Sequence, residues 1–238
     1  MSLLTTHPRE SIVLNLDLVM PMAGLGLRVK DLKIDQPKPL IKISGKPLFQ
    51  HSLDSLLSFA NVRHKVATVS DEINELEGFA LIRPEHQTNG PLESALLAVQ
   101  ELQGDLPFAV LDCDLSFTIN TLVRFGAADA IIMTFASDKP RYSYAQIANA
   151  SVTRVAEKKV ISTSAIAGCY LFKSKSTFLN LGQQLLSNNA LASELYISDL
   201  LSVYLKHELR IKAIATNEYC SLGTTQEILS SGFSIDSK

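Results

Sequence analysis

The sequence predicts an α/β fold, with a Rossmann-like, mainly parallel sheet covered by helices on both faces. Short apolar segments with the length of strands alternate along the chain with segments of helical periodicity. Such alternation is typical of parallel sheets whose strands are joined by crossing helices. The 238 residues are 46% apolar, which is enough for one continuous core. The length allows one large domain or two small ones, and we expect a single domain over residues 1–238.

The predicted strands are short apolar segments, and the predicted helices are longer segments with helical periodicity. The strands are Leu18 to Met22, Lys65 to Ser70, Phe108 to Leu111, Ala130 to Phe135, Ala165 to Phe172 and Ile211 to Ala215. The helices are Pro47 to Phe59, Pro91 to Leu102, Lys175 to Ser187, Ile197 to His207 and Thr225 to Ser231. The first two helices begin at prolines, which suit a first helical turn because no intrahelical N–H bond is lost there.

Two polar segments, Tyr142 to Ala148 and Val152 to Ala156, are predicted to form an antiparallel pair. Ligands of open parallel sheets bind beyond the carboxyl ends of the strands. We expect the pair to be a small lid that carries Glu157 and Lys158 over that edge. An ordinary charged turn is the alternative interpretation of these two residues.

Charge and composition exclude several classes of protein. The net charge of −2 and the pI near 6.2 give no general basic field, so nucleic acid is not an expected partner. No apolar run reaches membrane-spanning length, so we expect a soluble protein that does not bind membranes. Cys113, Cys169 and Cys220 lack metal-ligand spacing and lie in apolar or strand-like segments. They are typical of reduced thiols in a cytoplasmic protein.

A glycine-rich loop after the first strand is the first candidate site. It reads Ala23-Gly24-Leu25-Gly26-Leu27-Arg28 and is followed by Pro37-Lys38-Pro39. The glycines let backbone N–H groups approach phosphate oxygens, and Arg28 and Lys38 supply the positive charge that a bound triphosphate needs. We expect the two prolines to hold the backbone extended around Lys38 and so to fix its direction. A simple surface turn is the alternative.

Two better-known phosphate motifs do not fit this region. A dinucleotide-binding fingerprint needs a third small residue where Val29 stands. A Walker A loop ending at Gly45-Lys46 needs glycine at Leu40 and Ser or Thr at Pro47.

Two carboxylates form the second candidate site. Asp112 and Asp114 directly follow an apolar strand, and strand alternation puts residues two apart on the same side. Carboxylates in this position can bind a hard cation whose other ligands are water and phosphate. We expect them to face the same cleft as the glycine loop. A structural hydrogen bond is the alternative role for Asp112.

Motifs typical of one enzyme family recur in order along most of the chain. The glycine loop with Lys38 resembles the signature of sugar-phosphate nucleotidylyltransferases, which join a nucleoside triphosphate and a sugar 1-phosphate into a nucleotide sugar. Further segments resemble the family's base-recognition loop, its metal-binding strand end and its sugar-binding and closing segments. They are Thr88-Asn89-Gly90, Leu111-Asp112-Cys113-Asp114, Val155-Ala156-Glu157-Lys158, Gly168-Cys169-Tyr170-Leu171-Phe172 and Leu222-Gly223-Thr224.

The resemblance implies a nucleotidyltransferase of the nucleotide-diphospho-sugar transferase fold that uses Mg²⁺ and serves polysaccharide synthesis. It implies a nucleotide-binding half over about residues 11–125 and a sugar-phosphate-binding half with the lid over about 126–238. By resemblance, each group of residues has a role. Catalysis falls to Arg28 and Lys38; nucleotide binding to Ala23, Gly24, Leu25, Gly26, Gln87 and Gly90; sugar-phosphate binding to Glu157, Lys158 and Gly168; and the metal to Asp114 and Asp112.

Some of these positions allow a plainer interpretation. Gln87 could equally be a solvated loop residue. Glu194 and Asp199 resemble a further family segment, although capping of a helix start explains acidic residues there at least as well.

The chain also departs from the family pattern. Ser221 stands where the family commonly has a second metal-binding aspartate, Leu27 replaces a usual Ser or Thr, and Thr224-Thr225 lacks the usual proline. Either Asp114, with or without Asp112, holds the metal together with the nucleotide, or catalysis is weakened.

Two rival functions therefore stay open. One is a GT-A-like glycosyltransferase that uses Asp112-Cys113-Asp114, although the glycine loop argues against it. The other is a catalytically weak relative that binds nucleotide or sugar, which Ser221 suggests. The base, the oligomeric state and the acceptor, a sugar phosphate or a phosphocholine-type compound, are left open.

Overall fold

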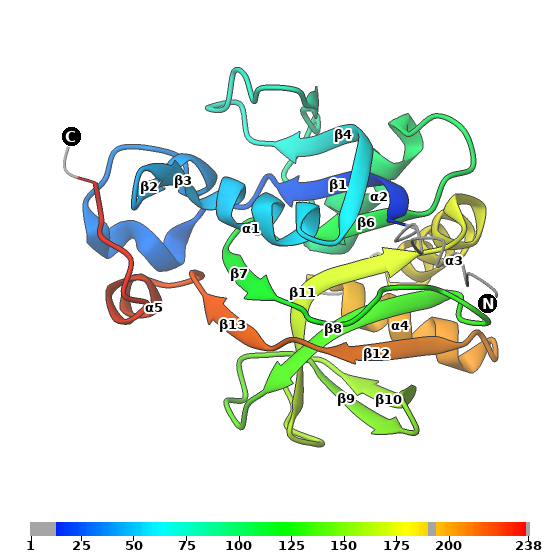
Figure 1. Cartoon of the computed structure of the whole chain (residues 1–238). Helices are drawn as coiled ribbons and strands as arrows, with labels where there is room; N and C mark the ends of the chain where they lie inside the picture. Colours follow the sequence, from blue (N-terminus) through cyan, green and yellow to red (C-terminus); the bar gives the residue numbers. More distant parts are fainter. Residues whose placement is uncertain (1–12, 190–193, 237–238) are drawn as a thin grey trace, which may run out of the picture.

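A nine-stranded mixed sheet forms the centre of the computed structural model, which describes residues 13–189 and 194–236 (Figure 1). From one edge to the other the strands are β5 (Ala80–Ile82), β4 (Ala60–Val69), β1 (Leu14–Met22), β6 (Phe108–Leu111), β11 (Ser164–Phe172), β8 (Ala130–Ala136), β12 (Ile211–Ala215), β10 (Ser151–Ala156) and β9 (Tyr144–Ala148).

The predicted α/β fold class is confirmed, but the sheet is mixed and not mainly parallel. Its parallel part is the block β5-β4-β1-β6 together with the pair β8 and β12. β11 runs antiparallel to both of its neighbours, β6 and β8. The chain reaches β11 directly from β9 and β10, an antiparallel pair at the edge of the same sheet, without the crossover helix that a parallel neighbour requires. The sheet is therefore mixed where it joins the predicted lid.

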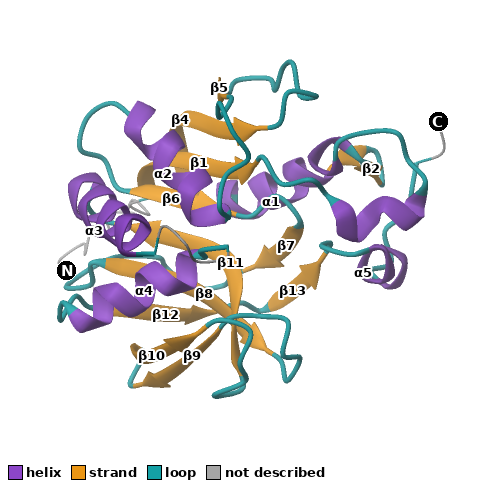
Figure 2. Cartoon of the chain, turned by 180° about the vertical axis from the view of Figure 1, so that it is seen from behind, coloured by secondary structure: helices purple, strands orange, loops and turns teal. Residues whose placement is uncertain are grey.

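Helices cover both faces of the sheet, as predicted. The helices α2 (Pro91–Glu101), α3 (Lys175–Asn188) and α4 (Ile197–Lys206) bury their apolar sides on one face, which faces the viewer in Figure 2. On the opposite face α1 (Leu48–Leu57) packs through Leu53 and Leu56 (Figure 1). No helix of the described ranges combines the length and apolar character needed to cross a membrane.

The element bounds agree with the predicted helices to within two residues at either end, including α5 (Thr225–Ser230). Several short elements were not predicted. They are the 3₁₀ helices η1 (Leu27–Leu32) and η2 (Lys38–Leu40), and the strands β5, β2 (Lys42–Ile43), β3 (Lys46–Pro47), β7 (Leu115–Thr118) and β13 (Glu218–Ser221). β7 pairs with β13 so that Ser221 lies opposite Leu115, the residue after Asp114.

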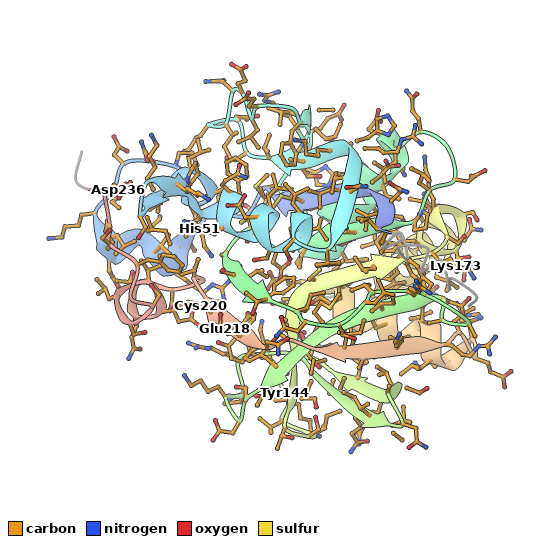
Figure 3. All side chains as sticks on the ribbon, viewed as in Figure 1. His51, Tyr144, Lys173, Glu218, Cys220 and Asp236 are labelled. Carbon is orange, nitrogen blue, oxygen red and sulfur yellow. The ribbon has the colours of Figure 1, made fainter. Side chains whose placement is uncertain are left out.

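The C-terminal segment packs against the loops that follow β1. Val29, Ile41, Leu222 and Ile228 belong to one small buried cluster. Beyond it, the Gly45 N–H donates to the Asp236 carboxylate at 2.9 Å (Figure 3). Residues more than 180 positions apart thus pack together. Their cluster includes Val29 of the 3₁₀ helix η1, which directly follows the glycine-rich loop.

Two serines of α1 attach this helix to β7. The Ser52 hydroxyl donates to the Leu115 carbonyl at 2.9 Å and accepts from the Leu115 N–H at 3.1 Å. The Ser55 hydroxyl accepts from the Phe117 N–H at 2.9 Å. These buried bonds satisfy the edge of a short strand that follows Asp114 directly, so they set where that carboxylate lies.

Replacing Ser52 should therefore destabilise the fold. Ser52→Ala leaves the N–H and carbonyl of Leu115 buried without their partner, and we expect the free energy of unfolding in urea to fall by about 1–3 kcal/mol. Ser187→Ala is the matched control, because its hydroxyl bonds to a carbonyl of its own helix on the exposed side; it should change stability by less than about 0.5 kcal/mol. Equal losses in the two variants would contradict the role given to Ser52.

Candidate functional site

A cavity of about 750 Å³ opens at the carboxyl ends of β1 and β6. It is lined by the loop after β1, by Lys38, by the loop before α2, by the residues after β6 and by Glu194. Ten predicted site residues meet there: Ala23, Gly24, Leu25, Gly26, Arg28, Lys38, Gln87, Gly90, Asp112 and Asp114. The other three, Glu157, Lys158 and Gly168, do not line it and are described below.

The glycine-rich loop turns at Gly26, where φ is +62°. A side chain there would begin 2.9 Å from Cβ of Lys38, so Gly26 allows both the turn and the approach of Lys38. Gly24 has open space around the position of a Cβ, which leaves its backbone accessible to a ligand. Arg28 follows in the 3₁₀ helix η1 and is exposed at the cavity.

Lys38 begins the 3₁₀ helix η2, so the expectation of an extended backbone on both sides of it was wrong. Pro39 occupies an early helical position, where its fixed φ is favourable and its missing N–H costs nothing. Only Pro37 is extended, with ψ of 138°. The turn still fixes the direction of Lys38, whose side chain is 9% exposed.

The Lys38 ammonium joins three distant segments. It forms an ion pair with the Asp114 carboxylate and donates to the Gly223 carbonyl at 3.1 Å. Burial raises the pKa of the Asp114 carboxyl, but the charges of Lys38 and Arg28 and the hydrogen bond from Lys38 leave that pKa below its ordinary value. Asp114 is therefore held as a carboxylate beside a basic cavity wall.

Asp112 has the opposite electrostatic situation. Burial and the neighbouring Asp114 charge raise the pKa of the Asp112 carboxyl to about 7. Its carboxylate fills the space beside Gly168, where an added Cβ would lie 2.5 Å from Asp112 Oδ2 and φ is +69°. In this structure the missing side chain of Gly168 makes room for Asp112. The contact of Gly168 with the sugar ring, which the resemblance implies, stays a prediction.

The loop before α2, at residues 86–90, is held by Glu93 and Ser94, two residues that the sequence analysis did not single out. The Glu93 carboxylate accepts from the Asn89 N–H at 2.5 Å and lies 3.1 Å from His86 Nε2. The hydroxyls of Thr88 and Ser94 are 2.7 Å apart. An acidic residue in the first turn of α2 was the available signal, since such residues cap helix starts.

Gly90 is required at the end of this loop. Its φ is +113°, and a side chain there would begin 2.6 Å from the Leu195 carbonyl oxygen and 2.8 Å from Glu194 Cγ. The segment before α4 therefore packs directly on the loop. Asp199 caps α4 by accepting from the Tyr196 N–H at 2.8 Å, which supports the capping interpretation of this residue.

Glu157 and Lys158 follow β10 outside the cavity lining. The Glu157 carboxylate accepts hydrogen bonds from the hydroxyls of Ser143 and, at 2.6 Å, Ser198. The Lys158 ammonium lies 4.2 Å from the ring centroid of Tyr196 and donates to its hydroxyl. Both residues thus have specific partners on neighbouring elements, which an ordinary solvated turn would not require.

Ser221 lines a second hollow of about 340 Å³ together with Tyr142 and Glu227. The Glu227 carboxylate there is 2.6 Å from Arg141 and accepts from the Tyr142 hydroxyl at 2.9 Å. This second hollow also has no cluster of metal ligands, since the described residues include no group of three or more His, Cys, Asp or Glu side chains able to hold a metal ion.

Asp112 and Asp114 nevertheless fit a hydrated cation. The two carboxylates lie close enough for one to raise the pKa of the other, and a divalent cation would relieve that repulsion. Mg²⁺ in nucleotide sites usually takes one or two carboxylates and completes its shell with water and phosphate oxygens. The donor set fits a cation that arrives with a nucleotide better than a permanently bound one.

Comparison with known proteins identifies the sequence family and the fold. The profile of the MobA-like NTP transferase domain matches residues 19–195. The bifunctional protein GlmU of Aliarcobacter butzleri is 26% identical over 232 residues, which cover 89% of this chain and 51% of that protein. The mannose-1-phosphate guanylyltransferase catalytic subunit beta of Drosophila melanogaster is 28% identical over 175 residues, or 63% and 46% of the two chains. The chain thus spans about half the length of these curated relatives.

Solved structures share the fold at lower sequence identity. The nucleoside-diphosphate-sugar pyrophosphorylase of Vibrio cholerae RC9 superposes with a TM-score of 0.77 at 22% identity, covering 89% of this chain and 98% of that one. The inositol-1-phosphate CTP transferase of T. maritima gives 0.72 at 13% identity, with coverage of 90% and 92%.

The raised pKa of Asp112 gives a pH-dependent stability. The carboxyl of the unfolded chain loses its proton near pH 3.8, whereas the folded carboxyl keeps it until about pH 7. Stability owed to this group is therefore lost as pH rises from 3.8 to about 7. Asp112→Asn cannot ionise, so we expect it to be more stable than the wild type at pH 8 and nearly equal to it near pH 4.

Urea unfolding in EDTA between pH 4 and pH 8 measures this difference. Asp71→Asn, a change at an exposed carboxylate, is the control, and its difference from the wild type should not depend on pH in this way. A pH-independent difference for Asp112→Asn would show that Asp112 ionises without penalty.

Proposed function

The chain belongs to the MobA-like NTP transferase domain family, and we propose that it is a nucleotidyltransferase that joins a nucleoside triphosphate to a sugar 1-phosphate. The products would be a nucleotide sugar and pyrophosphate. One observation supports this most strongly: a glycine-rich loop, two cationic side chains and two carboxylates line a single cavity together with the loop at residues 87–91.

The reaction is a single displacement at phosphorus. An oxygen of the sugar phosphate attacks the α-phosphorus, a new O–P bond forms, and the bond from the α-phosphorus to the bridging oxygen breaks so that pyrophosphate leaves with the electron pair. Such transfers depend mainly on positioning and on neutralising charge. We assign the exposed backbone of Gly24 and the Arg28 guanidinium to the β- and γ-phosphates, and the loop with Gln87 and Gly90 to the base.

Lys38 is assigned to the reacting phosphate. Without substrate its ammonium pairs with Asp114 and the Gly223 carbonyl. A charged phosphate oxygen in the cavity is a stronger hydrogen-bond acceptor than the Gly223 carbonyl. We therefore expect the Lys38 ammonium to turn from the carbonyl to the phosphate while the aliphatic part of its side chain stays in place. Asp114 and Asp112 would hold Mg²⁺, which supplies Lewis-acid neutralisation of phosphate oxygens when bound.

The acceptor side belongs to the region after β10. We assign Glu157 to the hydroxyls of the acceptor and Lys158 to its phosphate. The Glu157 charge acts on Asp112, and Lys158 is bonded through Tyr196 to Glu194, which lines the cavity. We also propose that residues 11–125 chiefly bind the nucleotide and 126–238 the acceptor, although the Gly223 carbonyl reaches the nucleotide half. The three free thiols fit a reducing, cytoplasmic compartment.

Pyrophosphate release tests the activity and the role of Lys38. The wild type is assayed with GTP, CTP, UTP and dTTP against mannose 1-phosphate and glucose 1-phosphate in Mg²⁺. Lys38→Met should lower kcat/KM for the active pair by about 100-fold or more, because a positioned charge at the reacting phosphate is lost. Lys46→Met is the control, since Lys46 is 54% exposed and pairs with Asp54 outside the cavity.

Two outcomes would reject this function. Transfer from a supplied nucleotide sugar, without pyrophosphate release from a triphosphate, would favour a glycosyltransferase that uses Asp112 and Asp114. Binding of nucleotide by calorimetry, with no turnover of any pair, would favour a binding relative.

A further inference from the structure

Tyr196 lies between the acceptor side and the nucleotide side of the proposed site. Its hydroxyl donates to the Glu194 carboxylate, which lines the cavity, and accepts from the Lys158 ammonium after β10. The Lys158 ammonium also lies 4.2 Å from the centroid of the Tyr196 ring. One side chain thus contacts both Lys158, which is assigned to the acceptor, and Glu194, which lines the cavity assigned to the nucleotide.

The backbone around Tyr196 is attached to the base-side loop. The Leu195 N–H donates to the Asn89 carbonyl at 2.8 Å, and the Leu195 carbonyl accepts from the Leu92 N–H at 3.1 Å. Gly90 lacks the side chain that would collide with this carbonyl. Because these contacts leave little free space, a shift of residues 194–196 would also move the loop at 87–91.

The same tyrosine is attached to the turn that carries Lys158. Next to it, the Glu157 carboxylate accepts from Ser198 of α4 at 2.6 Å, so the turn contacts the start of α4 at two points. Lys158 itself has φ of +48°, a left-handed conformation that is unfavourable for a side chain with a Cβ. Such conformations persist only where the surroundings impose them and are frequent at functional sites.

We propose, on the basis of the function proposed above, that Tyr196 is a positioning residue that couples acceptor binding at Lys158 to nucleotide binding beside Glu194 and Gly90. Holding a lysine side chain in one conformation costs conformational entropy, and Tyr196 meets part of that cost before the acceptor arrives. An acceptor phosphate that engages Lys158 then also stabilises Tyr196, Glu194 and the loop beneath them. Thermodynamic linkage requires the reverse effect, so bound nucleotide should favour the acceptor equally.

Tyr196→Phe tests the coupling, because it keeps the ring beside Lys158 and removes both contacts of the hydroxyl. Tyr204→Phe is a closely matched control within α4, the helix that Tyr196 precedes, since the Tyr204 hydroxyl is buried and has no hydrogen-bond partner among residues 13–189 and 194–236. Initial rates with the active triphosphate and sugar phosphate give the KM of the triphosphate at low and at saturating acceptor.

In the wild type we expect saturating acceptor to lower the KM of the triphosphate by about fivefold, the equivalent of one hydrogen bond near 1 kcal/mol. Tyr196→Phe and Lys158→Met should each bring the ratio of the two KM values, at low and at saturating acceptor, close to one. The double variant should give the same ratio as Lys158→Met alone. Tyr204→Phe should keep the wild-type ratio. A wild-type ratio in Tyr196→Phe, or a ratio of one in the wild type itself, would overturn the coupling.

Amide hydrogen exchange of the free protein provides a test that needs no substrate. Tyr196→Phe should speed exchange in peptides covering 87–91 and 157–159, whereas Tyr204→Phe should leave both unchanged. Unaltered exchange at both segments in Tyr196→Phe would overturn the positioning role. If no substrate pair turns over, the proposed function fails while this measurement still decides whether Tyr196 holds the two segments together.

Discussion

The contact of the Lys38 ammonium with the Asp114 carboxylate and the Gly223 carbonyl is the constraint on which the site depends. Lys38 comes from a 3₁₀ turn near the start of the chain, Asp114 from the end of a central strand, and Gly223 from the segment before α5. A partly buried ammonium and a partly buried carboxylate are each costly alone, and removing one partner leaves the charge of the other uncompensated. The pair therefore fixes the distance between the glycine loop and the carboxylates before any ligand binds.

Electrostatic cost concentrates at the same place. Asp112 is partly buried beside Asp114 with its pKa raised, and Gly168 adopts a left-handed conformation that leaves space for it. A chain selected for stability alone would have little reason to place two carboxylates there. Buried like charges of this kind are typical of sites that meet a cation or a phosphate-bound metal, because the ligand removes the penalty. The Glu157 carboxylate differs from that of Asp112, because it accepts hydrogen bonds from two serine hydroxyls.

The sequence predicted the strands and helices well because their periodicity is strong, as β6 and α2 illustrate. It also predicted that the glycine loop and the two aspartates face one cleft, because they stand at strand ends, and Arg28, Lys38, Asp112 and Asp114 do line one cavity. It did not reveal that β7 pairs with β13 or that Ser52 and Ser55 hold β7, because such pairing depends on residues more than 60 positions apart. Tyr196 was missed for the same reason: its partner Lys158 belongs to another element, and a tyrosine before a helix has no distinctive local pattern.

Binding of a triphosphate in the cavity is the central claim, and a crystal structure of the protein soaked with Mg²⁺ and nucleoside triphosphates tests it most directly. We predict that the triphosphate lies along residues 23–28, with Arg28 on its outer phosphates and Lys38 Nζ turned from the Gly223 carbonyl to a phosphate oxygen. Density for the base should lie beside Gln87 and Gly90. A triphosphate bound elsewhere, or one that touches neither Arg28 nor Lys38, would contradict the account.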